Sequence, residues 1–452
     1  MLRFFASGLA VAALAGTIST ARAENFLSEW WQGPCATGNW MGGRDILVDH
    51  GVTLSGEWKA NILWDVDGGA EQRFGYDDEW KLRALLDVSK ITNWKALDGL
   101  TLFSDVRYRG GSGVNKWAGA TGNFAPSAYQ GGHLWRFQNA YATYAVPELF
   151  GIRNLLTVSG GWQNPTDHFI RQPLNKFFVN NTFSSGRGLS ANGIPWGGSY
   201  AAWGGYLNVK PVDWYYAQAG LYLAIPQGTA TNNHGLAFAG YRINPDLNGL
   251  YFLAETGVTP KFGSAQLPGR YAAGFIYWGV ENRSFFGQSC DEKVAVYWQA
   301  DQMLFREPSP VESVLLPGKG ASDGKTAAAP KSKPGEQGLS LFSLVNFAPK
   351  FNNNVPFYFQ TGLVYKGLIP GRDDDQAGVA LAFGDYSSSK QIVDENSGKP
   401  VQTYEGVLEF DYRLQINKWA YVQPTLQYII QPGATSLLSN ATVIGFQTGI
   451  TF

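Results

Sequence analysis

The chain ends with Ala441-Thr-Val-Ile-Gly-Phe-Gln-Thr-Gly-Ile-Thr-Phe452, the stretch that decides the fold. Every second residue from Thr442 to Phe452 is apolar apart from two threonines, and the residues between them are mostly small or polar. A period of two is typical of a β-strand with one apolar face. In a soluble protein this strand would be an exposed, adhesive edge, whereas a closed barrel pairs the last strand with the first. The stretch therefore favours a transmembrane β-barrel.

The amino-terminal end of the sequence has the pattern of a secretory signal peptide over 1–23. A basic residue, Arg3, precedes an apolar run over 4–18, and Ala21-Arg22-Ala23 is an A-x-A cleavage site. The alternative is a membrane anchor, but glycine and hydroxyl residues interrupt a run already shorter than the roughly 20 residues that a spanning helix needs. We expect export and a mature protein that begins at Glu24.

The composition fits a barrel and weakens several other classes. The chain has 55 glycines and 15 % aromatic residues, and only 16 % of its residues are charged. Beyond the leader no apolar run approaches the length of a membrane helix, about 18 residues, so any membrane span must consist of strands. Its 35 basic and 36 acidic residues nearly cancel, which gives no support for a nucleic-acid partner.

Three segments alternate most clearly, namely Val52 to Val66, Trp80 to Lys90 and Leu100 to Arg109. Their even-numbered side chains are mostly apolar and their odd-numbered ones mostly charged or polar. A Lys or Arg on the lipid face near the midplane costs roughly 2–4 kcal/mol, so the odd-numbered charges should face the lumen. Further segments bring the total to about sixteen strands: 133–146, 154–164, 199–210, 213–224, 249–259, 270–280, 293–305, 338–347, 356–366, 376–386, 404–415, 420–430 and 441–452.

These segments predict an all-β fold, a transmembrane antiparallel barrel over 52–452. It follows an N-terminal periplasmic segment over 24–51, in which Arg44 to His50 is expected to form a short helix that Gly51 ends. We expect the last strand to pair with Val52 to Val66, which would place Gln447 and Thr451 in the lumen.

The connections follow from the strand count. With both termini in the periplasm, loops after odd-numbered strands are extracellular, and the first of them would span 67–79. The segment from Glu307 to Gly338, rich in Pro, Ala, Lys and Ser, then falls on the periplasmic side as a flexible insertion. Either this insertion is unusual, or the strand count slips by one around it.

Charged residues of the first three strands are the candidates for the wall of a solute path. Opposed carboxylates and guanidinium groups supply many donors and acceptors without a large net charge, which suits a neutral solute, and contacts must stay weak so that the solute can leave. The alternative is that these charges only solvate and stiffen the wall. The candidates are Glu57, Lys59, Arg83, Asp87, Asp105, Arg107 and Arg109.

The loop from Asn164 to Ser199 is the best candidate for a constriction. It is the longest predicted extracellular loop and carries Arg171 and Trp196 among several aromatic residues. A loop so aromatic should pack against something, either the lumen wall or the neighbouring loops. The segment from Gly110 to Gly132 is the second choice.

Other chemistry finds little support in the sequence. Cys35 is periplasmic and Cys290 extracellular in this topology, about 25 Å of apolar band apart, whereas a disulfide needs Cα atoms within roughly 7 Å. We expect no bridge, unless the N-terminal segment threads up through the lumen. The four histidines show no metal-ligand spacing, and His168 lacks a nucleophile partner, so we expect neither a cofactor nor an enzyme.

The carboxyl-terminal tract, over Tyr404–Tyr412 and Trp419–Gly433, resembles the carbohydrate-selective porin (OprB-like) family. So do Asn39–Arg44, Gly362–Gly367 and Pro370–Asp375. The resemblance spans almost the whole mature chain. It implies a sixteen-stranded outer-membrane porin through which monosaccharides and similar small neutral solutes diffuse, with loops folded inward to form an eyelet.

The expectation is therefore a multi-pass outer-membrane barrel of a Gram-negative bacterium that passes small carbohydrates or polyols. Its partners would be these solutes, the membrane lipid and, through the terminal Phe452, the insertion machinery for outer-membrane proteins. Related porins occur as monomers and trimers, so a homo-oligomer is open. The alternatives are a general or structural barrel and, with less support, a barrel-embedded enzyme.

Overall fold

The computed structural model describes residues 27–129, 133–183, 187–197, 200–225, 233–236, 249–307 and 337–452. The predicted signal peptide and its cleavage site lie outside the described residues, and so does most of the insertion predicted between Glu307 and Gly338.

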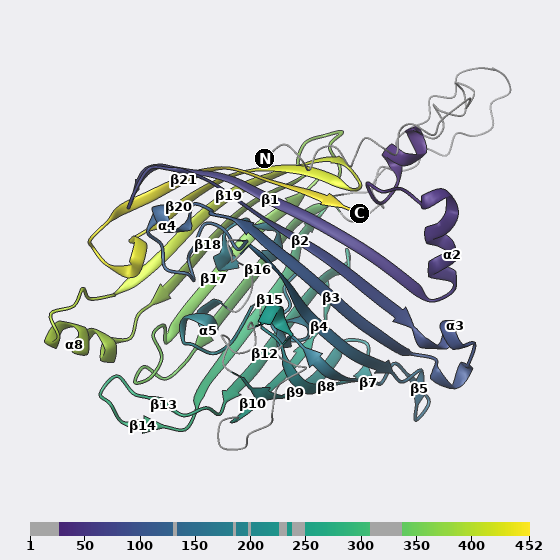
Figure 1. The fold of residues 1–452 in the computed structure, drawn as a ribbon, viewed down its shortest axis with the longest axis horizontal. Helices are drawn as coiled ribbons and strands as arrows, with labels where there is room; N and C mark the ends of the chain where they lie inside the picture. Colours follow the sequence, from purple (N-terminus) through teal and green to yellow (C-terminus); the bar gives the residue numbers. More distant parts are fainter. Residues whose placement is uncertain are drawn as a thin grey trace.

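Sixteen strands form a closed antiparallel barrel, and a two-residue strand, β11 (Lys261–Phe262), extends one of its hairpins (Figure 1). Each of the sixteen predicted segments overlaps one barrel strand, so the predicted count is confirmed. The barrel strands are β1 (Val52–Gly69), β2 (Phe74–Asp87), β3 (Leu100–Gly111), β4 (Leu134–Ala145), β7 (Leu156–Gln163), β8 (Ala202–Val212), β9 (Tyr215–Ala224), β10 (Gly249–Val258), β12 (Leu267–Trp278), β15 (Lys293–Arg306), β16 (Gly338–Phe347), β17 (Phe357–Lys366), β18 (Gln376–Asp385), β19 (Tyr404–Asn417), β20 (Ala420–Ile430) and β21 (Ser439–Thr451).

The barrel closes between its first and last strands, as the terminal stretch predicts. Antiparallel pairing of β1 with β21 sets Glu57 opposite Thr451 and Asn61 opposite Gln447. Inside the barrel the side chain of Gln447 donates to Asn61 at 2.9 Å. Closure leaves no free edge on either terminal strand.

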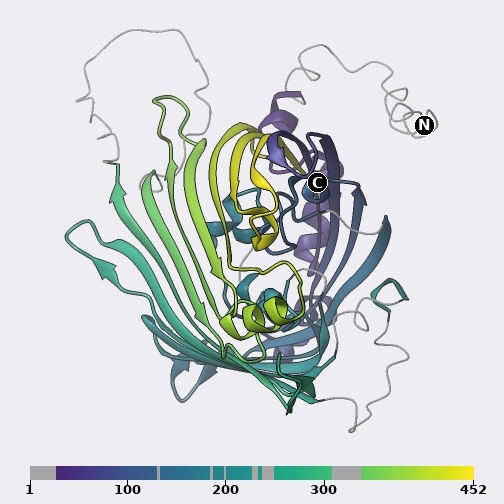
Figure 2. The same cartoon turned by 90° about the vertical axis from the view of Figure 1, so that its left-hand side faces the viewer.

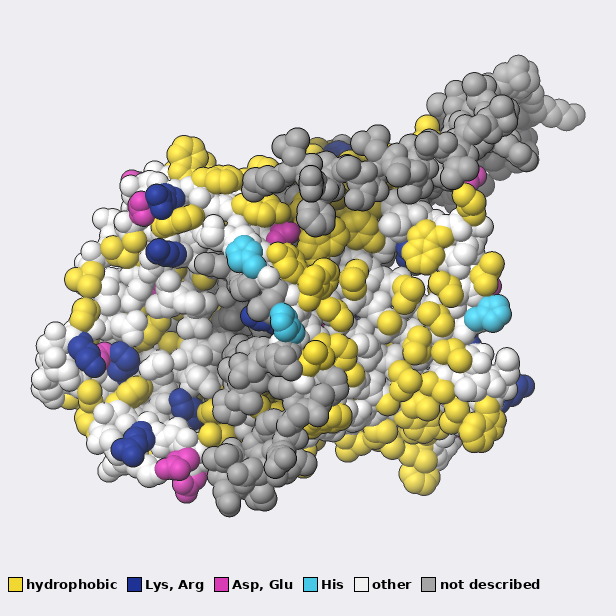
Figure 3. All heavy atoms as spheres, in the orientation of Figure 1, with side chains coloured by type: hydrophobic (Ala, Val, Ile, Leu, Met, Phe, Trp, Pro, Cys, Tyr) yellow, Lys and Arg dark blue, Asp and Glu magenta, His cyan; other side chains and the backbone are white. Residues whose placement is uncertain are grey.

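The outer face of the barrel is apolar. Hydrophobic side chains cover much of the face in Figure 3, while charged ones gather toward the end that carries α8 (Ser388–Asn396). At the end near the carboxyl terminus Trp80 stacks on Phe452 at 5.5 Å between ring centroids. Exposed members of the outer face include Leu54, Leu82, Leu102, Leu221, Trp298, Phe347, Phe410, Leu426 and Ile444.

The second strand corrects one prediction. β2 begins at Phe74, so the predicted extracellular loop over 67–79 is wrong, and only 70–73 separates β1 from β2. The acidic run before Trp80 looks like a loop in sequence, but its members lie in the strand and accept hydrogen bonds from neighbouring side chains. The carboxylate of Asp77 accepts from Ser127 Oγ at 2.7 Å and that of Asp78 from Trp58 Nε1 at 3.2 Å.

Short elements complete the end of the barrel at which β1 begins and β21 ends. The helix predicted from Arg44 is α2 (Gly43–Asp49), which follows η2 (Trp40–Gly42). None of the described helices is long and apolar enough to cross a membrane. The other elements at this end are α3 (Val88–Thr92), η3 (Lys95–Leu97) and the hairpin of β5 (Glu148–Leu149) with β6 (Ile152–Arg153).

The opposite end carries the longer connections. They include α8, the hairpin of β13 (Asn282–Arg283) with β14 (Ser289–Cys290), η7 (Asn233–Gly235) and η8 (Pro432–Ala434). β15 pairs directly with β16, with Arg306 opposite Gly338, so the strand count does not slip. Both cysteines are free, as predicted.

Two of these connections turn back into the barrel, where Figure 2 shows their short helices inside the ring of strands. The constriction loop, residues 164–201, contains η4 (Pro165–Asp167), η5 (Asn175–Phe177), η6 (Asn181–Phe183) and α5 (Arg187–Ala191). The second inner loop, residues 112–133, contains α4 (Asn115–Ala118). Of the two alternatives, a lumen position and a cap, the structure shows the lumen position for the constriction loop.

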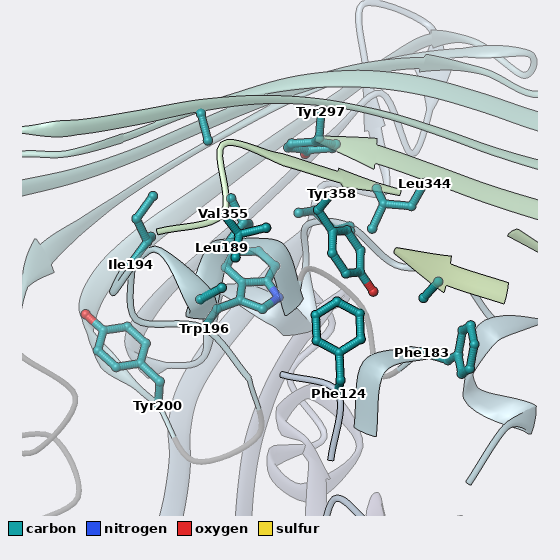
Figure 4. Packing of buried hydrophobic residues seen from close by; sticks show 14 of the residues in the cluster. Phe124, Phe183, Leu189, Ile194, Trp196, Tyr200, Tyr297, Leu344, Val355 and Tyr358 are labelled. Atoms are coloured by element: carbon teal, nitrogen blue, oxygen red, sulfur yellow. The ribbon is translucent and has the colours of Figure 1, made fainter. Parts of the chain in front are cut away.

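The inner loops bury an aromatic core within the lumen (Figure 4). Trp196 and Tyr200 of the constriction loop belong to this core, and the ring of Tyr200 lies 6.1 Å from that of Tyr251 between centroids. Phe124 of the second inner loop faces Tyr358, also at 6.1 Å between ring centroids. Wall residues of this core, such as Tyr251, Tyr297, Phe342 and Tyr358, come from β10, β15, β16 and β17. The loops therefore fill that side of the lumen.

Candidate solute constriction

A cavity of about 460 Å³ lies between the constriction loop and strands β1 to β4, the side of the lumen that the aromatic core leaves open. The second inner loop contributes Ala128 and Tyr129. Strand residues that line the cavity are Lys59, Glu79, Lys81, Arg83, Phe103, Asp105, Arg107, Arg109, Asn139 and Tyr141, and loop residues include Thr166, Asp167, Arg171, Lys176, Phe178 and Asn180.

Strand register builds the charged side of this cavity, which we call the charged wall (Glu57 and Lys59 of β1; Glu79, Lys81 and Arg83 of β2; Asp105, Arg107 and Arg109 of β3). The rows Glu57–Lys81–Arg107 and Lys59–Glu79–Arg109 run straight across the three strands. Directly opposed side chains in a sheet lie close enough to interact. Alternation along each strand thus gathers the charges on one inner surface.

Ion pairs bind the charged wall into a network. Glu79 lies 3.1 Å from Lys81 and 2.7 Å from Arg109, and Asp105 lies 3.1 Å from Arg107. Glu57 lies 2.7 Å from Lys59 of its own strand. It also lies 3.6 Å from Lys81 and 3.5 Å from Arg83, both of β2. These pairs fix the long side chains in place, so their donors and acceptors are preorganised around the cavity.

Two buried carboxylates of the barrel hold the constriction loop. Glu409 of β19 accepts from the backbone N–H groups of Val179 at 2.8 Å and Asn180 at 3.1 Å. Glu255 of β10 accepts from the N–H group of Ile170 at 3.3 Å. A buried N–H group without an acceptor is costly, so these contacts decide the path of the loop across the lumen.

Contacts of the backbone also orient the loop's cations. Arg270 of β12, which pairs with Glu255 at 2.9 Å, donates to the backbone carbonyl of Arg171. The side chains of Arg171 and Lys176 are exposed and line the cavity. The loop therefore turns its backbone toward the barrel and these two charges toward the open space.

The second inner loop is fixed in the same manner. Glu405 of β19 accepts from Thr121, through its N–H at 3.0 Å and its hydroxyl group at 2.5 Å. Asn181 of the constriction loop donates its backbone N–H to the carbonyl of Ala125 at 3.0 Å. The two loops thus form one packed unit.

His168, at the start of the constriction loop, is packed rather than reactive. Its ring stacks on Tyr206 with 4.0 Å between centroids, and its Nε2 lies 3.0 Å from the side-chain oxygen of Gln163. Burial, with a smaller contribution from the charge of Arg171, lowers the pKa of His168 to about 3. The imidazole is therefore neutral near pH 7. No group of residues that could hold a metal ion occurs in the described part of the chain.

The structure brings together most of the predicted site residues. Lys59, Arg83, Asp105, Arg107, Arg109 and Arg171 all line the cavity. Glu57 lies beside them in the wall, 23 % exposed, with its carboxylate turned to the three cations it pairs with.

Two predicted residues lie elsewhere. Asp87 is at the end of β2, where its carboxylate accepts from the N–H group of Lys90 and caps α3, because the strand ends three residues before the sequence pattern does. Trp196 is 1 % exposed and belongs to the aromatic core, because its large ring is buried between the loop and the barrel rather than turned to the cavity.

Several lining residues are absent from the sequence-based candidates. Glu79 and Lys81 share the inner face of β2 with Arg83, so alternation alone could have identified them. Phe103 and Tyr141 have ring centroids 5.2 Å apart. Phe103 shares the odd-numbered inner row of β3 with Asp105 and Arg107, so alternation could have identified it as well, although an apolar ring interrupts the charge pattern.

A closed sixteen-stranded barrel with an apolar outer face and a lumen narrowed by inward-folded loops defines the class of outer-membrane porins. The model of the carbohydrate-selective porin, OprB family matches residues 71–452. The chain belongs to this family, and it is an outer-membrane porin for carbohydrates.

Individual relatives agree with this assignment. Porin B of Pseudomonas aeruginosa is 27 % identical over 446 residues, which is 92 % of this chain and 90 % of that protein. The putative porin QuiX of Acinetobacter baylyi is 22 % identical over 484 residues and is matched over the full length of both chains. In fold, the high-pH structure of Pseudomonas putida OprB is similar with a TM-score of 0.77 and 22 % identity, covering 93 % of this chain and 99 % of that one.

Proposed function

We propose that monosaccharides and small polyols cross the barrel through the cavity between the charged wall and the constriction loop. The observation that carries this proposal is the placement of that loop, which fills one side of the lumen and leaves a polar space of about 460 Å³ on the other. A space of this size admits a single sugar ring more readily than an oligosaccharide.

The lining suits a hydroxyl-rich solute. Tyr129 and Thr166 offer neutral donors and acceptors, and the ion-paired side chains of the charged wall offer charged ones. The paired rings of Phe103 and Tyr141 offer an apolar surface for the C–H face of a pyranose. Many weak contacts of this kind let a solute enter without trapping it.

Efflux of sugars from proteoliposomes tests the proposal. With the purified protein, glucose should leave rapidly and a trisaccharide slowly. The double variant Phe103→Ala/Tyr141→Ala should alter the rate for glucose, whereas Phe347→Ala, which removes an exposed ring from the outer face, should not. Equal rates for mono- and trisaccharides would refute a constriction of this size.

Further proposals concern export and assembly. The leader would be removed before Glu24, and the outer face would contact lipid. The insertion machinery would recognise the terminal Phe452. In the folded barrel the backbone of Phe452 pairs with Gly56, and its ring lies against Trp80 on the outer face. Deleting Phe452 should reduce the amount of protein in the outer membrane without changing its synthesis, and unchanged amounts would contradict this role.

We also propose that the chain is a channel without enzymatic activity. The support is its family, whose relatives are porins. Purified protein that hydrolysed an ester or glycoside substrate at a rate above the background would contradict this proposal.

A further inference from the structure

The constriction carries more positive than negative charge. Seven cationic side chains line the cavity, five from the charged wall and two, Arg171 and Lys176, from the constriction loop. Three carboxylates line it, those of Glu79, Asp105 and Asp167. Even when Glu57 is added, the cations remain in excess. The near-neutral composition of the whole chain therefore conceals a locally positive site.

The carboxylates of the charged wall are already engaged. Glu79 and Asp105 each pair with one or two cations of the same wall, and Asp105 also accepts from Asn139 at 2.7 Å. Their charge is thus compensated locally, and they remain available to a solute mainly as hydrogen-bond acceptors.

The loop cations are different. Within the described residues neither Arg171 nor Lys176 makes an ion pair, and both side chains are exposed to the cavity. Partial burial of the ammonium group and the neighbouring charge of Arg171 lower the pKa of Lys176, while the nearby carboxylate of Asp167 opposes this shift. Like charges held together beside an open space favour an anion, and a confined space with low-dielectric walls strengthens their field.

We infer that the constriction prefers carbohydrates that bear a carboxylate, such as hexuronates, over neutral sugars of the same size. The carboxylate lies between Arg171 and Lys176, while hydroxyl groups of the solute face Tyr129 and Thr166 of the same cavity lining. This inference rests on the proposed function, because it assigns a solute class to the same cavity.

Glucuronate and glucose test the inference, since they differ in a carboxylate at one ring carbon, and protonated glucosamine supplies the opposite charge. Efflux of each from proteoliposomes is measured with the membrane potential clamped. Glucuronate should leave several-fold faster than glucose, and glucosamine more slowly than either. The ratio of glucuronate to glucose efflux should fall in Arg171→Gln/Lys176→Gln.

The matched control is Lys350→Gln/Lys399→Gln, which removes the same charge from exposed positions on loops outside the lumen. It should keep the wild-type ratio, and circular dichroism should show that both double variants are folded. A wild-type glucuronate rate no higher than that of glucose, or an unchanged ratio in the loop variant, overturns the inference while the sugar porin stands. If glucose itself fails to leave the vesicles, the proposed function fails instead.

Discussion

Removing the anchor of the constriction loop should open the channel. The carboxylate of Glu409 accepts the backbone N–H groups of Val179 and Asn180, and both groups are buried. Glu409→Leu leaves the N–H group of Asn180 without an acceptor, at about 1–3 kcal/mol for one buried N–H, whereas that of Val179 keeps a longer contact of 3.3 Å with Asp411. The anchoring should therefore weaken by about 1–3 kcal/mol, which raises the population of the released loop by about 5-fold to about 140-fold.

The released segment carries Lys176, Phe178 and Asn180, all of which line the cavity, so its movement widens the constriction. Single-channel recordings in planar bilayers should show a higher conductance for Glu409→Leu, and vesicle efflux should show faster passage of trisaccharides. Glu409→Gln is the matched control, because its side-chain carbonyl at the position of Oε1 still accepts from both N–H groups. If Glu409→Leu is folded and keeps wild-type conductance and size selection, the reasoning is refuted.

Three further predictions follow from other contacts. Gly378→Leu should also displace the constriction loop and raise conductance in bilayers, because a Cβ atom at Gly378 would come within 2.5 Å of the ring of Phe177. The pKa of His168 is about 3 in the folded protein and 6.5 in the unfolded chain, so the folded protein should be fully stabilised above pH 6.5 and should lose stability as the pH falls below that value. The melting temperature of His168→Gln should therefore fall less on acidification than that of the wild type, and an equal fall would contradict this. Alkylation of the denatured protein without reductant should add two adducts by mass spectrometry, on Cys35 and Cys290, and a missing pair of adducts would indicate a disulfide.

The sequence predicts the barrel well because its determinants are local. Alternation from Val52 to Val66, which only Leu63 interrupts on the polar row, and alternation in the terminal stretch fix which side chains face lipid. A slip by one residue would place charges there. The same alternation identifies most of the charged wall. Alternation does not predict the role of Asp87. Its polar side chain continues the pattern of the strand, but it caps the helix α3 instead of lining the lumen.

The arrangement of the lumen could not be predicted in this way. Glu255 and Glu409 look like ordinary lumen carboxylates in sequence, and their role as anchors depends on loop segments that lie 85 and 229 residues away. The burial of Trp196 likewise depends on distant strands that supply its neighbours. Contacts of this kind decide which side of the barrel stays open, and no local pattern contains them.

The most direct test of the account is a glucose titration of the wild-type channel in planar bilayers. If sugars pass through the cavity between the charged wall and the constriction loop, glucose should lower the single-channel ion current as its concentration rises, beyond the change in conductivity of the bath. An absence of channels, or a current that follows only the conductivity of the bath, would contradict it.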